Sequence, residues 1–183
     1  RYVENYLIEI RQISDASNSG FGGKITVAPK SIMNSIQRAV IGFWNQSQLL
    51  LHINVKELKG SIEVAKEALI PAAPVIRKLK QVFMLNMLLD NTAAISFHNK
   101  QGDNNVEMST MVIEFHNWLQ TFFLPSIIVP SATYLEGSRM IQCGGDELSR
   151  MGRLGEEIRL NPRIFKNLCK ILRFKPTIDL FAN

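Results

Sequence analysis

The chain has 183 residues, of which 46% are hydrophobic and 20% are charged, a composition typical of one soluble globular domain. No apolar run approaches the roughly 20 residues that a membrane span needs, and no signal-peptide pattern is present, so we expect no membrane association. The chain starts on Arg1 rather than Met, which indicates a piece of a longer polypeptide.

The two cysteines lack paired spacing, which argues against a zinc site and a disulfide framework. They favour a reducing compartment, so we expect an intracellular location, cytoplasmic or nuclear. The net charge of +5 and the pI of about 9.4 favour a polyanionic partner only weakly, because a domain of this size can simply be basic.

The first half of the chain predicts three strands and a helix. Strands are expected over 6–14, 24–28 and 36–44, with a Ser/Asn/Gly-rich turn over 15–23 and an irregular linker over 29–34. From Val55 apolar residues recur at three- and four-residue steps, which predicts an amphipathic helix. Asn54 is its expected N-cap, with Glu57 at N3 as in a capping box. Pro71 and Pro74 interrupt the helical pattern.

The second half alternates strands and helices. The nearly all-apolar run 82–89 predicts a strand buried on both faces. A short helix is expected over 92–98, a longer helix over 106–123 and a strand over 126–133, followed by a loop and a short helix near Asp146. The alternation predicts a mixed α/β sheet domain. We place this domain in residues 1–152 and a basic helical C-terminal extension in residues 153–183.

The extension carries seven Lys or Arg residues against three acidic ones. An amphipathic helix packed on the domain with a solvated basic side is the favoured interpretation. A basic strip that guides a polyanionic substrate is the alternative, and its binding would weaken steeply with salt.

Four acidic residues carry most of the functional signal. Each also has a purely structural explanation: a turn at Asp15, a capping box at Glu57, a helix cap at Asp90 and a favourable helix dipole at Asp146. Their joint placement at strand ends and helix starts can bring them to one point. A cluster of like charges needs cations, and two divalent metals roughly 3.5–4 Å apart would both hold it and drive phosphodiester chemistry.

Five blocks in collinear order make the chain recognisable. They are Asp15-Ala-Ser-Asn-Ser-Gly-Phe-Gly-Gly, His52-Ile-Asn-Val-Lys-Glu-Leu-Lys, Asp90-Asn-Thr-Ala-Ala, Asn99-Lys-Gln-Gly and Gly145-Asp-Glu-Leu-Ser-Arg-Met. Together they resemble the ribonuclease H domain of a retroelement polyprotein. The resemblance is greatest to the tyrosine-recombinase (DIRS-like) retrotransposons and their pararetroviral and gypsy-like relatives, and it runs from about Ile8 to Ala182.

The resemblance implies a ribonuclease H-like fold, a five-stranded mixed β-sheet with helices on both faces. It implies an endonuclease that cuts the RNA strand of an RNA–DNA hybrid during reverse transcription, next to a reverse transcriptase domain in the same polyprotein. The family's catalytic metal ligands fall on Asp15, Glu57, Asp90 and Asp146. Hard oxygen ligands favour two Mg²⁺ ions, with Mn²⁺ as a substitute. No small-molecule cofactor is expected.

The same alignment suggests where nucleic acid would bind and where the family pattern is broken. Many ribonucleases H have a histidine in the loop before the last aspartate, and Tyr134 stands there instead; it would not shuttle protons near neutral pH as imidazole can. The three histidines do not form a metal site. Expected nucleic-acid contacts are Ser17, Asn91, His98, Lys100, Arg139 and Arg150. For Arg139 and Arg150, a solvated surface charge is an alternative of at least equal weight.

Two alternatives share the fold. One is a catalytically inactive domain that binds nucleic acid or scaffolds an adjacent reverse transcriptase. The other is a DNA strand-transfer nuclease, against which the order of the five blocks and the lack of a zinc-binding His/Cys module both argue.

Overall fold

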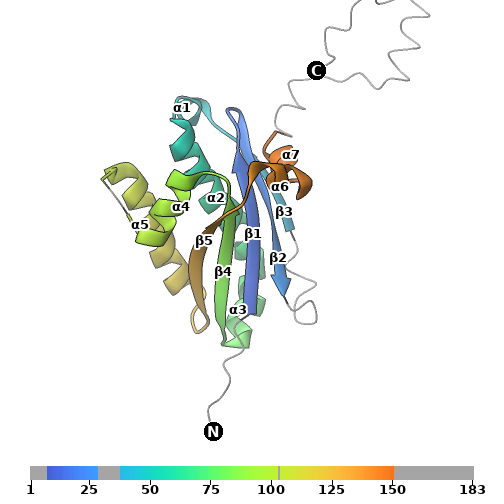
Figure 1. Cartoon of the computed structure of the whole chain (residues 1–183). Coiled ribbons are helices and arrows are strands. Elements are labelled where there is room, and N and C mark those ends of the chain that lie inside the picture. The colour runs from blue at the N-terminus through green and yellow to red at the C-terminus, as the bar shows by residue number, and fades with distance from the viewer. Residues whose placement is uncertain (1–7, 29–37, 103, 151–183) are drawn as a thin grey trace, which may run out of the picture. The chain divides into compact units, whose positions relative to one another are not determined.

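A single mixed β-sheet organises the chain. The computed structural model describes residues 8–28, 38–102 and 104–150 (Figure 1). The strands are β1 (Ile8–Ala16), β2 (Gly20–Ala28), β3 (Arg38–Phe43), β4 (Val82–Leu89) and β5 (Ile127–Tyr134). They lie in the order β3-β2-β1-β4-β5, with β1–β2 and β2–β3 antiparallel and β1–β4 and β4–β5 parallel.

The helices connect and cover these strands. They are α1 (Gln46–Leu49), α2 (Ile53–Leu69), the 3₁₀ turn η1 (Ile70–Ala72), α3 (Ala73–Leu79), α4 (Thr92–Lys100), α5 (Val106–Phe122), α6 (Gly137–Gln142) and α7 (Gly145–Arg150). No helix in the described part of the chain is long and apolar enough to cross a membrane.

Helices lie on both faces of the sheet, as two adjacent glycines of β2 demonstrate. Successive residues of a strand point to opposite faces. A Cβ added at Gly22 would lie 2.3 Å from the Leu148 carbonyl carbon in α7, whereas one added at Gly23 would lie 2.9 Å from Val64 Cγ1 in α2. The backbone of α7 therefore rests directly on one face while α2 packs on the other (Figure 1). The expected architecture, a five-stranded mixed sheet with helices on both faces, is confirmed.

The core lies on the α2 side of the sheet. Ile10 of β1 and Phe83 and Leu85 of β4 are fully buried there, together with Leu58 of α2 and Phe115 of α5. The expectation that β4 is buried on both faces is wrong, since its residues alternate between half-buried and buried. On the opposite face, α7 contacts β1, β2 and β3, which leaves that side of β4 partly open to solvent.

Several element boundaries differ from the predictions. The expected turn over 15–23 is shorter, because Asp15 pairs with Gly22 and Ala16 with Phe21, so that only residues 17–19 connect β1 to β2. Helix α6 forms where a loop was expected. The irregular linker over 29–34 and the extension over 153–183 lie outside the described residues.

The N-cap of α2 is His52 rather than Asn54. The His52 Nδ1 atom accepts the Asn54 N–H at 3.2 Å, which satisfies one of the free amides of the first turn. Glu57 is then the fifth residue of the helix, and the capping-box explanation for it is wrong.

Candidate metal centre

Three carboxylates from three different elements meet at one edge of the sheet. Carboxylate oxygens of Asp15, Glu57 and Asp90 all lie within 4.8 Å of one another. Asp15 is near the end of β1 and Asp90 directly follows β4; because these strands are parallel neighbours, their carboxyl ends share an edge. Glu57 reaches the same point from α2, which packs on β1.

Burial makes this arrangement electrostatically unfavourable for the protein alone. The exposed fraction is 9% for Asp15 and 8% for Glu57. Burial, followed by the charges of Asp15 and Asp90, raises the pKa of Glu57 to about 9. Burial is also the main cause that raises the pKa of Asp15 and of Asp90. Like-charged carboxylates this close together in a largely buried site resist ionising together unless a positive charge compensates them.

The donor set suits a hard divalent cation. Each of the three residues can contribute a carboxylate oxygen, the donor type that Mg²⁺ and Mn²⁺ prefer. A cation between them would replace the mutual repulsion with attraction and would keep all three ionised at neutral pH. The Ala16 N–H hydrogen bonds to both Asp15 and Glu57 and lowers the pKa of each, so it favours the ionised, metal-binding form.

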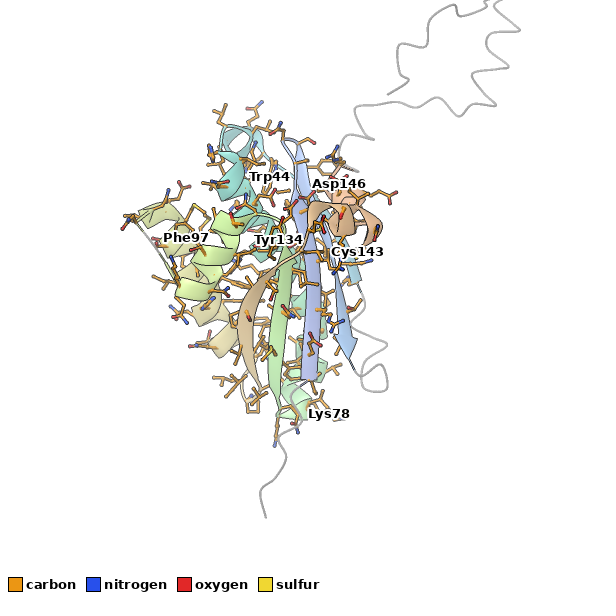
Figure 2. The ribbon with its side chains drawn as sticks, viewed as in Figure 1. Trp44, Lys78, Phe97, Tyr134, Cys143 and Asp146 are labelled. Atoms are coloured by element: carbon orange, nitrogen blue, oxygen red, sulfur yellow. The ribbon has the colours of Figure 1, made fainter. Side chains whose placement is uncertain are left out.

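The fourth predicted ligand, Asp146, lies beside this group without joining it. Its Oδ1 atom accepts a 2.7 Å ion-pair hydrogen bond from Nε of Arg150, one turn further along α7. It is still close enough that its charge raises the pKa of Asp15 and of Asp90. Figure 2 shows Asp146 at the end of the sheet where Tyr134 terminates β5.

Ser149 is a functional candidate that the sequence analysis missed. Its hydroxyl lies 2.6 Å from Oδ2 of Asp15 and donates to it, across 134 positions of the chain. This hydrogen bond lowers the pKa of Asp15 and so opposes the effect of burial. The only sequence signal was that Ser149 lies in the last of the five blocks, three residues after Asp146.

Two expected nucleic-acid contacts have structural partners at the rim of the site. The Ser17 hydroxyl donates to the Ser149 carbonyl oxygen at 2.9 Å. The Asn91 side chain caps α4 by accepting the Ala94 N–H at 3.0 Å, and its Nδ2 donates to Oδ1 of Asn54 at 3.1 Å. Both residues are half-buried, so their contact with a ligand stays a prediction.

The basic side chains predicted to contact nucleic acid are exposed. Lys100 ends α4, Arg139 lies in α6 and Arg150 ends α7. Tyr134 is 56% exposed at the end of β5, so its hydroxyl is free of the core.

His98 does not fit the predicted role in nucleic-acid contact, because the structure buries it. It is 2% exposed, and its Nε2 lies 2.9 Å from the Ser61 hydroxyl. Since that hydroxyl donates to the Leu58 carbonyl at 2.7 Å, Nε2–H is the donor to Ser61. Burial, with a smaller contribution from His116, lowers the pKa of His98 to about 3, so it is a neutral core residue.

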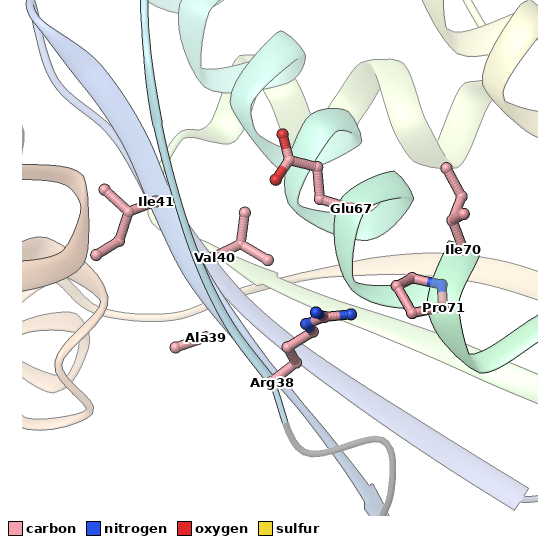
Figure 3. A pocket seen from close by; sticks show the side chains of 7 residues that line it. All are labelled: Arg38, Ala39, Val40, Ile41, Glu67, Ile70 and Pro71. Carbon is pink, nitrogen blue, oxygen red and sulfur yellow. The ribbon is translucent and has the colours of Figure 1, made fainter.

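A separate groove lies between β3 and the end of α2 (Figure 3). Its volume is about 370 Å³, and it is lined by Arg38, Ala39, Val40, Ile41, Glu67, Ile70 and Pro71. None of the clustered carboxylates lines it, so it is separate from the candidate metal centre.

Comparison of the sequence with protein-family models gives no match, and comparison with curated proteins gives none either. Among solved structures, LC11-RNase H1 in complex with an RNA/DNA hybrid is similar with a TM-score of 0.47 and 9% identity, over 77% of this chain and 92% of that chain. The N-terminal RNase H domain of rv2228c from Mycobacterium tuberculosis gives 0.46 and 9%, over 81% and 97%. The foamy viral protease-reverse transcriptase in complex with dsDNA gives 0.42 and 17%, over 73% and 24%.

Proposed function

We propose that this domain is a metal-dependent endonuclease of the ribonuclease H type, which cleaves the RNA strand of RNA–DNA hybrids. The observation that carries the proposal is the group of buried Asp15, buried Glu57 and half-buried Asp90, whose carboxylate oxygens lie within 4.8 Å of one another. Folding alone gives no reason to gather three mutually repelling carboxylates, two of them buried, at one point.

Asp15, Glu57 and Asp90 would hold the cations, Mg²⁺ or Mn²⁺, and Asp146 would join them once it leaves Arg150. Two bound divalent ions supply an activated water and stabilise the charge that develops on the phosphate and the leaving 3′ oxygen. The three carboxylates would hold the ions in fixed positions, because two of them lie at strand ends and the third lies in a long helix. Ser17, Asn91, Lys100, Arg139 and Arg150 are our proposed contacts to the nucleic acid backbone.

The biological setting is a further part of the proposal. The five sequence blocks support a retroelement, in which this domain would act beside a reverse transcriptase domain of the same polyprotein during reverse transcription. That setting implies an intracellular site of action, cytoplasmic or nuclear. We also propose that the chain consists of the sheet domain over 1–152 and a basic helical extension over 153–183.

The second candidate is a catalytically inactive domain that binds nucleic acid or scaffolds its neighbour. One specific observation favours it: Asp146 is engaged by Arg150 rather than joined to the other three carboxylates. The tyrosine at position 134, where a histidine is common in the family, points the same way.

The deciding experiment is cleavage of a labelled RNA–DNA hybrid by the full chain with Mg²⁺, with Mn²⁺ and with chelator. Asp90→Asn keeps the shape of the side chain but removes a metal-binding charge, and it should abolish cutting. Glu147→Gln is the matched control, because it removes an exposed acidic charge next to Asp146 and should cut normally.

Metal-dependent cutting by the wild type and by Glu147→Gln, lost in Asp90→Asn, would support the nuclease. Binding of the hybrid with no cutting by any of these proteins, even with the reverse transcriptase domain added, would instead favour the inactive domain.

A further inference from the structure

Ser149 connects the two parts of the proposed metal centre. It is 1% exposed, and its 2.6 Å hydrogen bond to Oδ2 of Asp15 has the short length typical of a hydroxyl donating to a carboxylate. The same hydroxyl lies 2.9 Å from the carbonyl oxygen of Asp146. One side chain thus contacts a residue of the carboxylate group and the backbone of the residue predicted to complete it.

The position of this hydroxyl is set by backbone packing rather than by a flexible side chain. A Cβ added at Gly22 would lie 2.6 Å from the Ser149 nitrogen and 2.4 Å from the Leu148 oxygen, so α7 touches β2 without any intervening side chain. The Ser149 carbonyl oxygen also accepts the Ser17 hydroxyl at 2.9 Å. A side chain as short as serine, on a helix seated this closely, has little freedom to point elsewhere.

The hydrogen bond also determines how the Asp15 carboxyl group is oriented. A carboxylate has two oxygens and about four acceptor positions, so an oxygen that receives one hydroxyl can still bind a cation. The hydroxyl fixes the rotation of the carboxyl plane at Asp15, the residue that also receives the Ala16 N–H. This arrangement is that of an outer-shell partner, which orients a metal ligand without touching the metal.

We propose that Ser149 is a positioning residue that orients Asp15 for metal binding. It also fixes the position of α7, and therefore of Asp146, relative to Asp15, Glu57 and Asp90. The proposal rests on the proposed function, because it assigns a residue to the same site. The substrate of the site stays the same. The addition is a residue whose contacts link Asp146 to the group of Asp15, Glu57 and Asp90.

The test measures Mn²⁺ affinity by calorimetry, and kcat and KM for hybrid cleavage separately, in the full chain. Loss of an outer-shell partner typically weakens metal affinity or activity about 10- to 100-fold. Ser149→Ala should therefore weaken Mn²⁺ binding by about that factor and lower kcat, with KM for the hybrid unchanged. Ser149→Cys retains a weak donor and should recover part of the loss.

Ser126→Ala is the matched control. Ser126 is fully buried, and its hydroxyl donates to Ile76 O at 2.6 Å, but it lies at the opposite end of the sheet. Ser126 directly precedes β5, and Tyr134 at the other end of β5 pairs with Leu89, the residue before Asp90. At about 3.3 Å per residue, the length of this strand separates Ser126 from Tyr134 by roughly 25 Å. A general effect of losing a buried serine would appear in this variant as well, whereas the proposal expects Mn²⁺ affinity within about twofold of the wild type.

Circular dichroism would show whether Ser149→Ala is folded. If the folded variant binds Mn²⁺ with wild-type affinity, the positioning role is overturned, while the proposed nuclease function is unaffected. If Ser149→Ala does not fold, Ser149→Cys decides, and affinity equal to that of the wild type again overturns the role. A wild-type chain that neither binds Mn²⁺ nor cuts hybrid would overturn the proposed function itself, which is a distinguishable result.

Discussion

Asp146 and Arg150 form an ion pair within a single turn of α7, with Arg150 Nε 2.7 Å from Asp146 Oδ1. The Arg150 side chain is 59% exposed, and an exposed i,i+4 pair of this kind contributes only about 0.3–0.5 kcal/mol. The pair is therefore cheap to break when a phosphate competes for the guanidinium. Its release would free the Asp146 carboxylate for the group formed by Asp15, Glu57 and Asp90.

Replacing Arg150 should consequently affect hybrid binding more than stability. We expect Arg150→Ala to leave the melting temperature almost unchanged, to weaken hybrid binding and to reduce the salt slope of log K by about 1, as for the loss of one phosphate contact. Arg11→Ala is the matched control, since Arg11 is also 59% exposed and paired with a carboxylate, that of Glu9 at 3.0 Å. Equal salt slopes in both variants and the wild type would refute the contact.

The metal-free protein should lose stability as pH rises. The pKa of Glu57 is raised to about 9 from an ordinary value of 4.5, and the pKa values of Asp15 and Asp90 are raised too. Between these two values the folded state retains a proton that the unfolded state has released, so the free energy of unfolding falls with increasing pH. In chelator we expect a fall on the order of a few kcal/mol from pH 5 to pH 9, measured by urea unfolding.

Glu57→Gln isolates the cause of that fall. The amide cannot ionise, so the variant should show a flatter pH profile and exceed the wild type in stability at pH 8 without metal. Glu63→Gln, on the same helix but in an ion pair with Lys59, should retain the wild-type profile. A wild-type stability independent of pH across this range would contradict the burial of an ionisable cluster.

Divalent cations should restore the stability that the metal-free protein loses through repulsion among its clustered carboxylates. A ligand that binds only the folded state at about 100 times its Kd adds about 2.7 kcal/mol. For a chain of this size that corresponds to roughly 5–10 °C in melting temperature. Mg²⁺ and Mn²⁺ should produce this shift in the wild type and not in Asp15→Asn, as measured by thermal unfolding with and without chelator. A similar shift in Asp15→Asn would place the bound cation elsewhere.

His98 should behave as a core residue and not as a nucleic-acid ligand. Its Nε2–H donates to Ser61, and its exposed fraction is only 2%. We expect His98→Leu to cost about 1–3 kcal/mol in urea unfolding, because a buried hydroxyl loses its donor. Hybrid affinity of the folded variant should equal that of the wild type, and a selective loss of affinity at unchanged stability would restore the role predicted from the sequence.

The close packing of α7 on β2 can be tested by replacing Gly22. Its added Cβ would lie 2.3 Å from the backbone of Leu148, so Gly22→Ala should displace α7 and lower cleavage more than tenfold while the rest of the sheet stays folded. At Gly137 nothing lies within 4 Å of an added Cβ, and Gly137→Ala should leave cleavage unchanged. Hydrogen exchange of the α7 amides would report the displacement directly. Full activity in Gly22→Ala would show that α7 is not needed in this position.

The pattern of apolar and turn-forming residues predicted most of the secondary structure. The apolar run over 82–89 predicted β4 with its observed bounds, and the three- and four-residue spacing after Val55 predicted α2. The positions of Asp15 and Asp90 at strand ends also followed from the sequence, because strand ends are marked by local changes in composition. That these two strands are neighbours is shown by the structure, because the period of neither strand encodes it.

Tertiary packing decided everything that depends on contacts between distant residues. The Asp15–Ser149 hydrogen bond spans 134 positions, and no local pattern encodes it. The burial of His98 depends on how α4 packs against α2 and α5, and the open face of β4 depends on how little of the sheet α7 covers. Side-chain orientation decided the last point. The helix start at Asp146 and the family resemblance predicted that this residue joins the other carboxylates, whereas the structure pairs it with Arg150 one helical turn away.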